Sequence, residues 1–142
     1  MLTDEINDIE AIGPEELLDR YHQFVNDIIT DIGRQSVEST LDIPDNRILS
    51  FLNGDPTTLT IEDVAAIIAM TKPDRDQTEI LADIEDQLLF GMTTAVLNVD
   101  TVSASIDPDI SPKEVQQKLE GRLSMDLREY AHIRHFIATK QW

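Results

Sequence analysis

The chain has 142 residues, of which 41% are hydrophobic and 5% aromatic, and it contains no cysteine. This length fits one ordinary domain or two small ones, and the lack of cysteine excludes disulfides, thiolate metal sites and cysteine nucleophiles. The net charge of −17 indicates a strongly acidic surface. No apolar run reaches the ~20 residues of a membrane span, and the acidic start of the chain lacks the basic region of a secretory signal, so we expect a cytoplasmic protein without a membrane partner.

The first half of the chain is predicted to form helices only, after an N-terminal arm of residues 1–12 that shows little periodicity. Pro14 suits the first turn of a helix, and the spacing of Thr60 and Asp63 is typical of a capping box. Apolar residues recur at helical spacing in four segments, which are 14–32, a short helix with Val37 and Leu41 inward, 44–53 and 60–70.

A second series of helices is predicted after residues 71–77, a polar segment with a proline and four charges that marks the best candidate boundary. A long helix starts near residue 78, and its part from 88 to 97 is apolar on nearly every side. A helix of that kind is buried on all sides, so we expect it to lie between the two halves. Gly91 costs about 1 kcal/mol in a helix interior relative to alanine, which a close helix crossing would justify. Three further helices follow, namely 99–106, one capped by Ser111 with Glu114, and one opened by Ser124.

Residues 43–54 and 110–121 look like two copies of one element. Each copy has an isoleucine before the helix, a β-branched residue at its centre, a leucine one turn later and a closing glycine. The match extends upstream with two extra residues in the second turn, and downstream with one residue deleted. The pairs are Val37 with Val102, Leu41 with Ile106, Ile43 with Ile110, Ile48 with Val115, Leu52 with Leu119, Gly54 with Gly121, Leu59 with Met125, Ile61 with Leu127, Val64 with Tyr130 and Ile67 with Ile133. Such a sustained pattern indicates a duplicated structural unit.

The order of a short helix, a tight turn, a second helix ending in glycine and a third packing helix resembles the lambda-repressor-like, Cro-type helix-turn-helix domain. The resemblance covers roughly residues 15–71 and 78–140 and rests on the paired apolar residues and on Asn53-Gly54. It implies an all-α fold of two tandem helix-turn-helix-like bundles packed into one body. The domains expected on this basis are 1–12 as an N-terminal arm, 13–72 as the first unit and 73–142 as the second.

The resemblance also implies that the second helix of each unit faces DNA, with its first turn and a residue one turn later toward the bases. In the first unit the matching positions are Asp45, Asn46, Leu49 and Ser50. This set is poor, because aspartate meets phosphates with the wrong sign and Leu49 is apolar. We therefore expect an exposed Leu49 to contact a protein partner instead.

In the second unit the matching positions are Pro112, Lys113, Gln116 and Gln117. Glutamine pairs well with adenine, and lysine reaches guanine or a phosphate, while Lys118, Arg122 and Arg128 supply backbone contacts. Lys118 departs from the family pattern, because Phe51 stands at the equivalent position of the first copy. A solvated, glutamine-rich face without a ligand is the alternative. The predicted DNA-binding residues are Lys113, Gln116, Gln117, Lys118 and Arg122.

The acidic composition resembles that of proteins from salt-in haloarchaea, in which concentrated salt screens the repulsion between like charges. A nucleic-acid mimic or an acidic mesophilic protein is the alternative. The charge is uneven, because residues 111–142 carry +2 and the first 110 residues carry −19, which favours the C-terminal part for contact with an anionic partner. The whole chain also looks like a family of uncharacterised haloarchaeal proteins, and the segment GMTTAVLNVD at 91–100 carries that likeness without bringing an established activity.

Motifs for catalysis or cofactor binding are missing from the sequence. It has no glycine-rich phosphate loop, no G-x-S-x-G and no calcium loop, so we expect no enzyme, no catalytic residues and no cofactor. Glu129, His132 and His135 lie on one helical face at i, i+3, i+6 spacing. No fourth ligand is evident in the sequence, and we therefore predict no metal site.

These patterns lead to two hypotheses of different classes. The first is a DNA-associated regulatory protein, a transcriptional regulator adapted to high salt, that reads DNA with the helix at 111–122. The second is a non-enzymatic protein–protein interaction module built on degenerate helix-turn-helix units, with Leu49 as a partner contact. Self-association through one unit, which leaves the other unit to read DNA, is a third arrangement.

Overall fold

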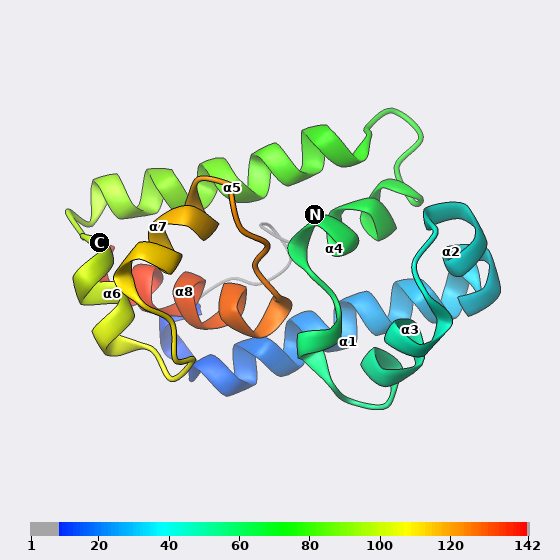
Figure 1. Cartoon of the computed structure of the whole chain (residues 1–142), viewed down its shortest axis with the longest axis horizontal. Helices are drawn as coiled ribbons and strands as arrows, with labels where there is room; N and C mark the ends of the chain where they lie inside the picture. The colour runs from blue at the N-terminus through cyan, green and yellow to red at the C-terminus, as the bar shows by residue number, and fades with distance from the viewer. Residues whose placement is uncertain (1–8, 142) are drawn as a thin grey trace.

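The computed structural model describes residues 9–141, and this part of the chain is built from α-helices without a β-strand (Figure 1). The predicted all-α class is confirmed. Most of the predicted arm at 1–12 lies outside the described residues. The helices are α1 (Pro14–Ile32), α2 (Arg34–Leu41), α3 (Asp45–Leu52), α4 (Ile61–Ala69), α5 (Gln77–Thr94), α6 (Val99–Ser105), α7 (Pro112–Leu119) and α8 (Leu127–Lys140), with short 3-10 turns η1 (Ile9–Ala11) and η2 (Pro56–Thr58).

Side-chain caps explain where several helices begin. Thr60 and Asp63 form the predicted capping box of α4, in which each side chain accepts a hydrogen bond from the other residue's backbone N–H. Ser111 caps α7 in the same way. The last helix begins later than predicted, because Asp126, not Ser124, is the residue whose side chain accepts from the first turn. The free N–H groups at a helix start need such an acceptor, so Asp126 fixes the start of α8.

Most residues that are paired in the repeat have matching exposures, with the exception of Leu52, which is partly exposed while Leu119 is buried. Ile48 and Val115 are both 0% exposed, and so are Val37 and Val102. This agreement is what two aligned copies predict, while their identity as helix-turn-helix units stays a prediction. The other pairs buried at both positions are Ile43 with Ile110, Leu59 with Met125, Ile61 with Leu127, Val64 with Tyr130 and Ile67 with Ile133.

The two halves of the chain are joined at the centre by a reciprocal pair of backbone hydrogen bonds. The N–H of Ile61 donates to the carbonyl of Met125 over 2.8 Å, and the N–H of Leu127 donates to the carbonyl of Leu59 over 3.2 Å. The two bonds are equivalent in the repeat, because Ile61 pairs with Leu127 and Leu59 pairs with Met125, as expected across a local two-fold axis. The most extensive packing, of α1 along α8 and of α4 along α5, also joins equivalent helix pairs (Figure 1). The buried apolar residues form one core, and the exact limits of the two predicted units stay a prediction.

The segment from 88 to 97 is not buried on all sides, so that prediction is wrong. One face of α5 packs into the core, but Leu89 is 42% exposed and Phe90 is 67% exposed. Val96, in the turn after α5, is 90% exposed. A continuous apolar run gives a helix apolar side chains on every face. In α5, one of these faces is not covered by any other element among the described residues.

Gly91 lies at the close helix crossing that the sequence predicts. A Cβ added at Gly91 would lie only 2.5 Å from Cγ2 of Ile137 in α8. The absence of a side chain therefore lets α5 and α8 approach closely. None of the helices in the described part of the chain is long and apolar enough to cross a membrane.

Candidate interaction surface around α7

Helix α7 is held on the core by its apolar face and presents polar side chains on the other. Val115 is 0% and Leu119 is 4% exposed, and the Ser111 capping box fixes the first turn. Lys113 and Gln116 are exposed, while Gln117 is partly exposed. The outward face of α7 therefore carries three of the five residues that the sequence predicts for DNA contact.

These three side chains and Arg122 line one depression of about 330 Å³, together with Pro112 and Val99. Lys113 forms no ion pair with any residue that the structure describes. Arg122 is 64% exposed, but its guanidinium is paired with the carboxylate of Glu120. The hydrogen bond from Arg122 lowers the pKa of Glu120, and a second bond from the amide of Gln116 adds to that effect. One of the two cations at this depression is therefore already neutralised by a neighbour.

Lys118 links two parts of the protein through an ion pair and a hydrogen bond. Its side chain is 11% exposed, and its Nζ lies 2.8 Å from Oε1 of Glu129 and 2.9 Å from the carbonyl oxygen of Ser124. The departure from the internal repeat at this position is thus explained, because the lysine links α7 to α8 where the first copy has the buried ring of Phe51. Lys118 is therefore not part of the proposed contact surface.

A second, more apolar depression of about 310 Å³ adjoins the first, since Gln116 and Val99 line both. Its other lining residues come from α5, the turn after it and the end of α7, and they include Leu89, Met92, Leu97, Leu119 and Glu120. Phe90 neighbours Leu89 on α5 and is exposed. We call this depression the α5–α7 groove, and we include in it the exposed Phe90 and Val96, which adjoin its lining residues Leu89 and Leu97 in the sequence. Sequence reasoning does not find this groove, because an all-apolar helix segment predicts burial on every side but is equally typical of a surface that another molecule covers.

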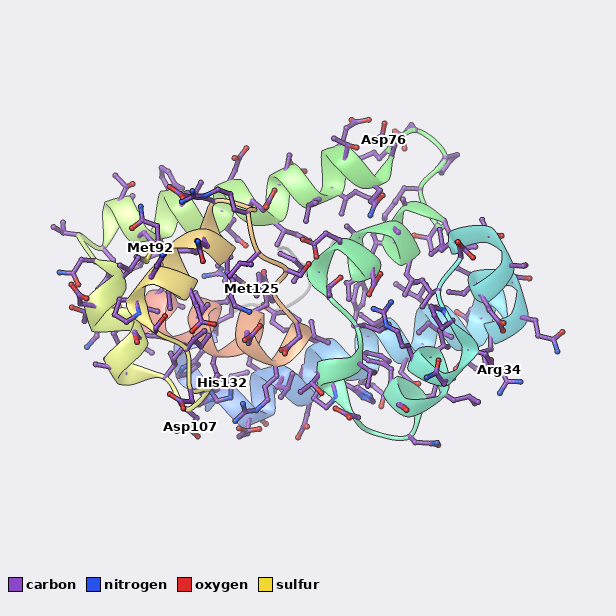
Figure 2. All side chains as sticks on the ribbon, viewed as in Figure 1. Arg34, Asp76, Met92, Asp107, Met125 and His132 are labelled. Atoms are coloured by element: carbon purple, nitrogen blue, oxygen red, sulfur yellow. The ribbon has the colours of Figure 1, made fainter. Side chains whose placement is uncertain are left out.

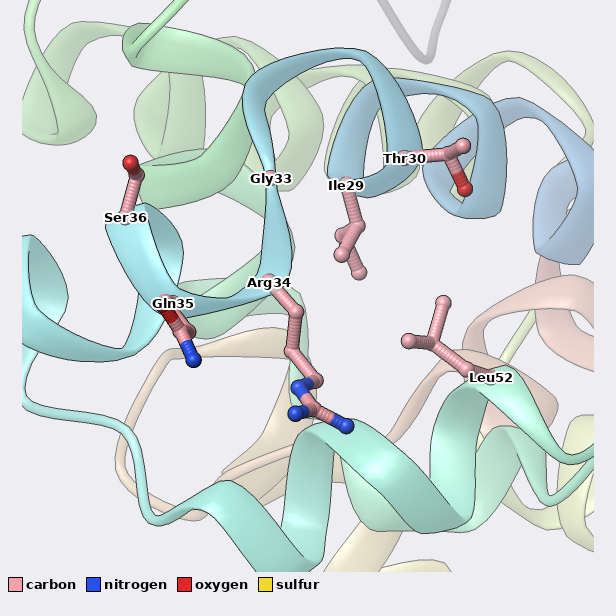
Figure 3. Close-up of a pocket in the computed structure, with 7 residues that line it drawn as sticks. All are labelled: Ile29, Thr30, Gly33, Arg34, Gln35, Ser36 and Leu52. Atoms are coloured by element: carbon pink, nitrogen blue, oxygen red, sulfur yellow. The ribbon is translucent and has the colours of Figure 1, made fainter.

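The corresponding helix α3 of the first half offers a weaker surface. Leu49, the predicted partner contact, is only partly exposed. Arg34 lies 3.3 Å from Oδ1 of Asp45, and Arg47 is paired with Asp63. Arg34 also lines a depression of about 500 Å³. Figure 3 shows Arg34 reaching toward α3 and the apolar side chains of Ile29 and Leu52 on the same side of the depression. Because both arginines are engaged with carboxylates, this half gives little attraction for phosphates.

The three residues that share one face of α8 at metal-ligand spacing are not brought together around one point. The carboxylate of Glu129 pairs with Lys118 and accepts a hydrogen bond from the backbone N–H of Asp126 at the start of α8. Nε2 of His135 lies 2.6 Å from the carbonyl oxygen of Ile12. His132 instead faces Glu15 of α1. The expectation that these three residues do not form a metal site together is consistent with this geometry.

Comparison with known proteins identifies a family, but it does not identify an activity. The chain belongs to a family of unknown function (DUF5791), whose model matches residues 17–140. No curated protein and no solved structure matches the chain. The match covers nearly the whole chain, in agreement with the expectation of an uncharacterised family.

Proposed function

We propose that this member of a family of unknown function is a non-enzymatic protein-interaction module that binds a helix of a partner protein in the α5–α7 groove. The observation that carries the proposal is the exposure of Leu89, Phe90 and Val96 beside a depression lined by further apolar side chains. Exposed large apolar side chains next to an apolar depression are typical of interaction sites in folded proteins. Association removes them from water, which is the main favourable term of most protein interfaces.

The chemistry of the groove favours an amphipathic helix as the partner segment. Apolar side chains spaced along one helix face fit a groove of this type, and specificity comes from polar groups at the rim. Glu120 lines the groove but is already paired with Arg122, so the attraction for a basic partner comes mainly from the charge of −17 that the protein as a whole carries. A partner helix with basic residues beside its apolar face is complementary to this surface, and that complementarity steers association.

Phe90 is expected to be the main contact within the groove. An aromatic side chain buries about 150–250 Å² when it is fully covered, and Phe90 is 67% exposed before association. Truncation of a central aromatic contact typically costs about 2 kcal/mol or more, which is at least a tenfold loss of affinity.

The test is pull-down of the full chain from a concentrated-KCl lysate, followed by affinity measurement with the purified partner. Phe90→Asp is expected to weaken binding at least tenfold. Leu123→Asp is the matched control, since Leu123 is also an exposed apolar residue (39%), but neither it nor its sequence neighbours line the depression, whereas Phe90 adjoins the lining residue Leu89. This control should leave the affinity unchanged. Equal binding by the native chain and Phe90→Asp would reject the proposed surface.

DNA association through α7 is the second candidate function, and the grouping of Lys113, Gln116, Gln117 and Arg122 at one depression favours it. Concentrated salt screens the repulsion from the acidic surface but also removes most of the gain from counterion release. Base-edge contacts by the two glutamines would then carry the binding. The double variant Lys113→Glu with Gln117→Ala is expected to abolish occupancy of genomic DNA fragments in concentrated KCl while leaving the Phe90-dependent protein contact intact. Undiminished DNA occupancy in that variant, or no DNA binding by the native chain, would exclude this candidate.

A further inference from the structure

Three metal-ligating side chains from distant parts of the sequence meet on one side of the second half. Glu15 lies in the first turn of α1, Asp107 lies in the turn between α6 and α7, and His132 lies in α8. Their ligand atoms all lie within 4.8 Å of one another, and Nε2 of His132 is 3.1 Å from Oε1 of Glu15. Figure 2 shows Asp107 and His132 close together at the edge of the molecule.

The cluster combines a fixed imidazole with two adjustable carboxylates. The side chain of His132 is 2% exposed, while that of Glu15 is 63% exposed and Asp107 is exposed as well. A depression of about 220 Å³, lined by Asp107, His132 and His135 among others, opens to the cluster from the surface. His135 uses its Nε2 for the carbonyl of Ile12, so His132 is the histidine that meets the carboxylates.

Both Asp107 and His132 depart from the internal repeat, and the two departures converge in space. The alignment that pairs Ile67 with Ile133 places Ala66 opposite His132, so the first copy has no ligand there. Asp107 lies in the turn that is two residues longer in the second copy. That turn is anchored by the buried Pro108 and by Ile110, which is 5% exposed. Neither the histidine at position 132 nor the longer turn with Asp107 is needed to stabilise the fold, because the first copy forms an equivalent core without them.

We propose that Glu15, Asp107 and His132 bind one divalent transition-metal ion, with zinc as the representative ion. Zinc accepts imidazole nitrogen and carboxylate oxygen at about 2.0–2.2 Å and commonly takes three protein ligands plus water. Tetrahedral ligands at that distance lie about 3.3 Å apart, so the two exposed carboxylates have to close by at most about 1.5 Å. The imidazole disfavours magnesium and calcium, which prefer oxygen ligands alone. The two carboxylates neutralise a dication, and the imidazole binds as the neutral tautomer with a free electron pair on Nε2.

The ion would join α1 to α8 and to the turn 106–111. This inference does not depend on the proposed interaction function, since the cluster is formed by a different set of residues from the α5–α7 groove. The metal adds a cross-link to the packing of α1 along α8, and it stabilises the folded chain by mass action because the unfolded chain does not hold the three ligands together.

The test is titration of the metal-stripped full chain with Zn²⁺ in buffered KCl, read by calorimetry and by thermal unfolding, with Mg²⁺ titrated in parallel. One saturable equivalent of Zn²⁺ is expected, which a large excess of Mg²⁺ does not displace. At a Zn²⁺ concentration about a hundredfold above Kd, the midpoint of unfolding should rise on the order of 5–10 °C.

Matched variants separate the site from the many other acidic groups of the surface. Glu15→Gln and Asp107→Asn should each lower the affinity for Zn²⁺ at least tenfold, whereas their exposed neighbours Glu16→Gln and Asp109→Asn should not. His132→Gln should abolish the saturable step, and the two carboxylate variants decide the matter if His132→Gln fails to fold. Non-saturable binding, or equal loss in the site variants and their controls, would overturn the proposal.

Discussion

Replacement of Lys118 by methionine tests whether this lysine ties two helices together or contacts a nucleic acid. Methionine keeps the length and much of the shape of the side chain but removes the ammonium. The side chains of Lys118 and Glu129 are 11% and 16% exposed, and their charged atoms lie 2.8 Å apart. The substitution therefore leaves a largely buried carboxylate without its counter-charge.

The expected loss of stability follows from that environment. Removal of one partner of a buried ion pair costs about 3–5 kcal/mol. Here Glu129 keeps some contact with solvent, and its Oε1 still accepts a hydrogen bond from the backbone N–H of Asp126 over 3.0 Å. We therefore expect Lys118→Met to lower the free energy of unfolding by about 2–3 kcal/mol, below the range for full burial.

Urea unfolding at constant KCl concentration, followed by circular dichroism, measures this change. Lys113→Met is the control, because Lys113 is exposed and should change stability by no more than about 0.5 kcal/mol. The double variant Lys118→Met with Glu129→Gln should recover part of the loss, since a neutral amide leaves no buried charge unpaired. If Lys118→Met costs no more than Lys113→Met, the internal role of Lys118 is refuted.

Three further outcomes are expected. Because the net charge is −17, the urea midpoint should rise when KCl increases from about 0.1 M to about 3 M as screening lengths shrink, and a constant midpoint would contradict adaptation to high salt. Gly91→Val should lower the free energy of unfolding by about 1–3 kcal/mol through overpacking against Ile137, whereas a gain of roughly 0.3–0.5 kcal/mol would show that helix propensity alone decides. The pKa of Tyr130 is raised well above 10, mainly by burial and secondly by the nearby Tyr21. The neutral phenol therefore stabilises the fold fully below about pH 10, and this stabilisation is lost as the pH rises further. The urea midpoint should therefore fall from pH 9 to pH 11 more steeply for the native chain than for Tyr130→Phe, and parallel slopes would count against this role.

Periodicity and capping chemistry made the fold largely predictable. Most apolar pairs of the repeat, among them Ile48 with Val115, are buried together because helix spacing directly sets which face is apolar. The Thr60–Asp63 and Ser111 caps were predictable for a similar reason, since a cap and its acceptor lie within four residues. These features depend on short-range geometry, which a sequence displays.

Features that depend on tertiary contact were not predictable. The exposure of Phe90 depends on which faces of α5 other helices cover, and apolarity alone does not settle that. The burial of Lys118 depends on Glu129 eleven residues away across a turn. Glu15 meets His132 across 117 residues, so a search for ligands along α8 alone does not find the cluster.

Photo-crosslinking at Phe90 tests the proposed interaction function most directly. A benzophenone-bearing phenylalanine analogue at this position keeps an aromatic ring beside the α5–α7 groove, and the same analogue at the exposed Thr139 of α8 serves as the control. We predict one dominant protein adduct from Phe90 in concentrated KCl, attached through a basic amphipathic helix, which disappears when Leu97→Asp is added to the groove. An adduct to DNA, an adduct unaffected by Leu97→Asp, or the same products from Thr139 would contradict the account.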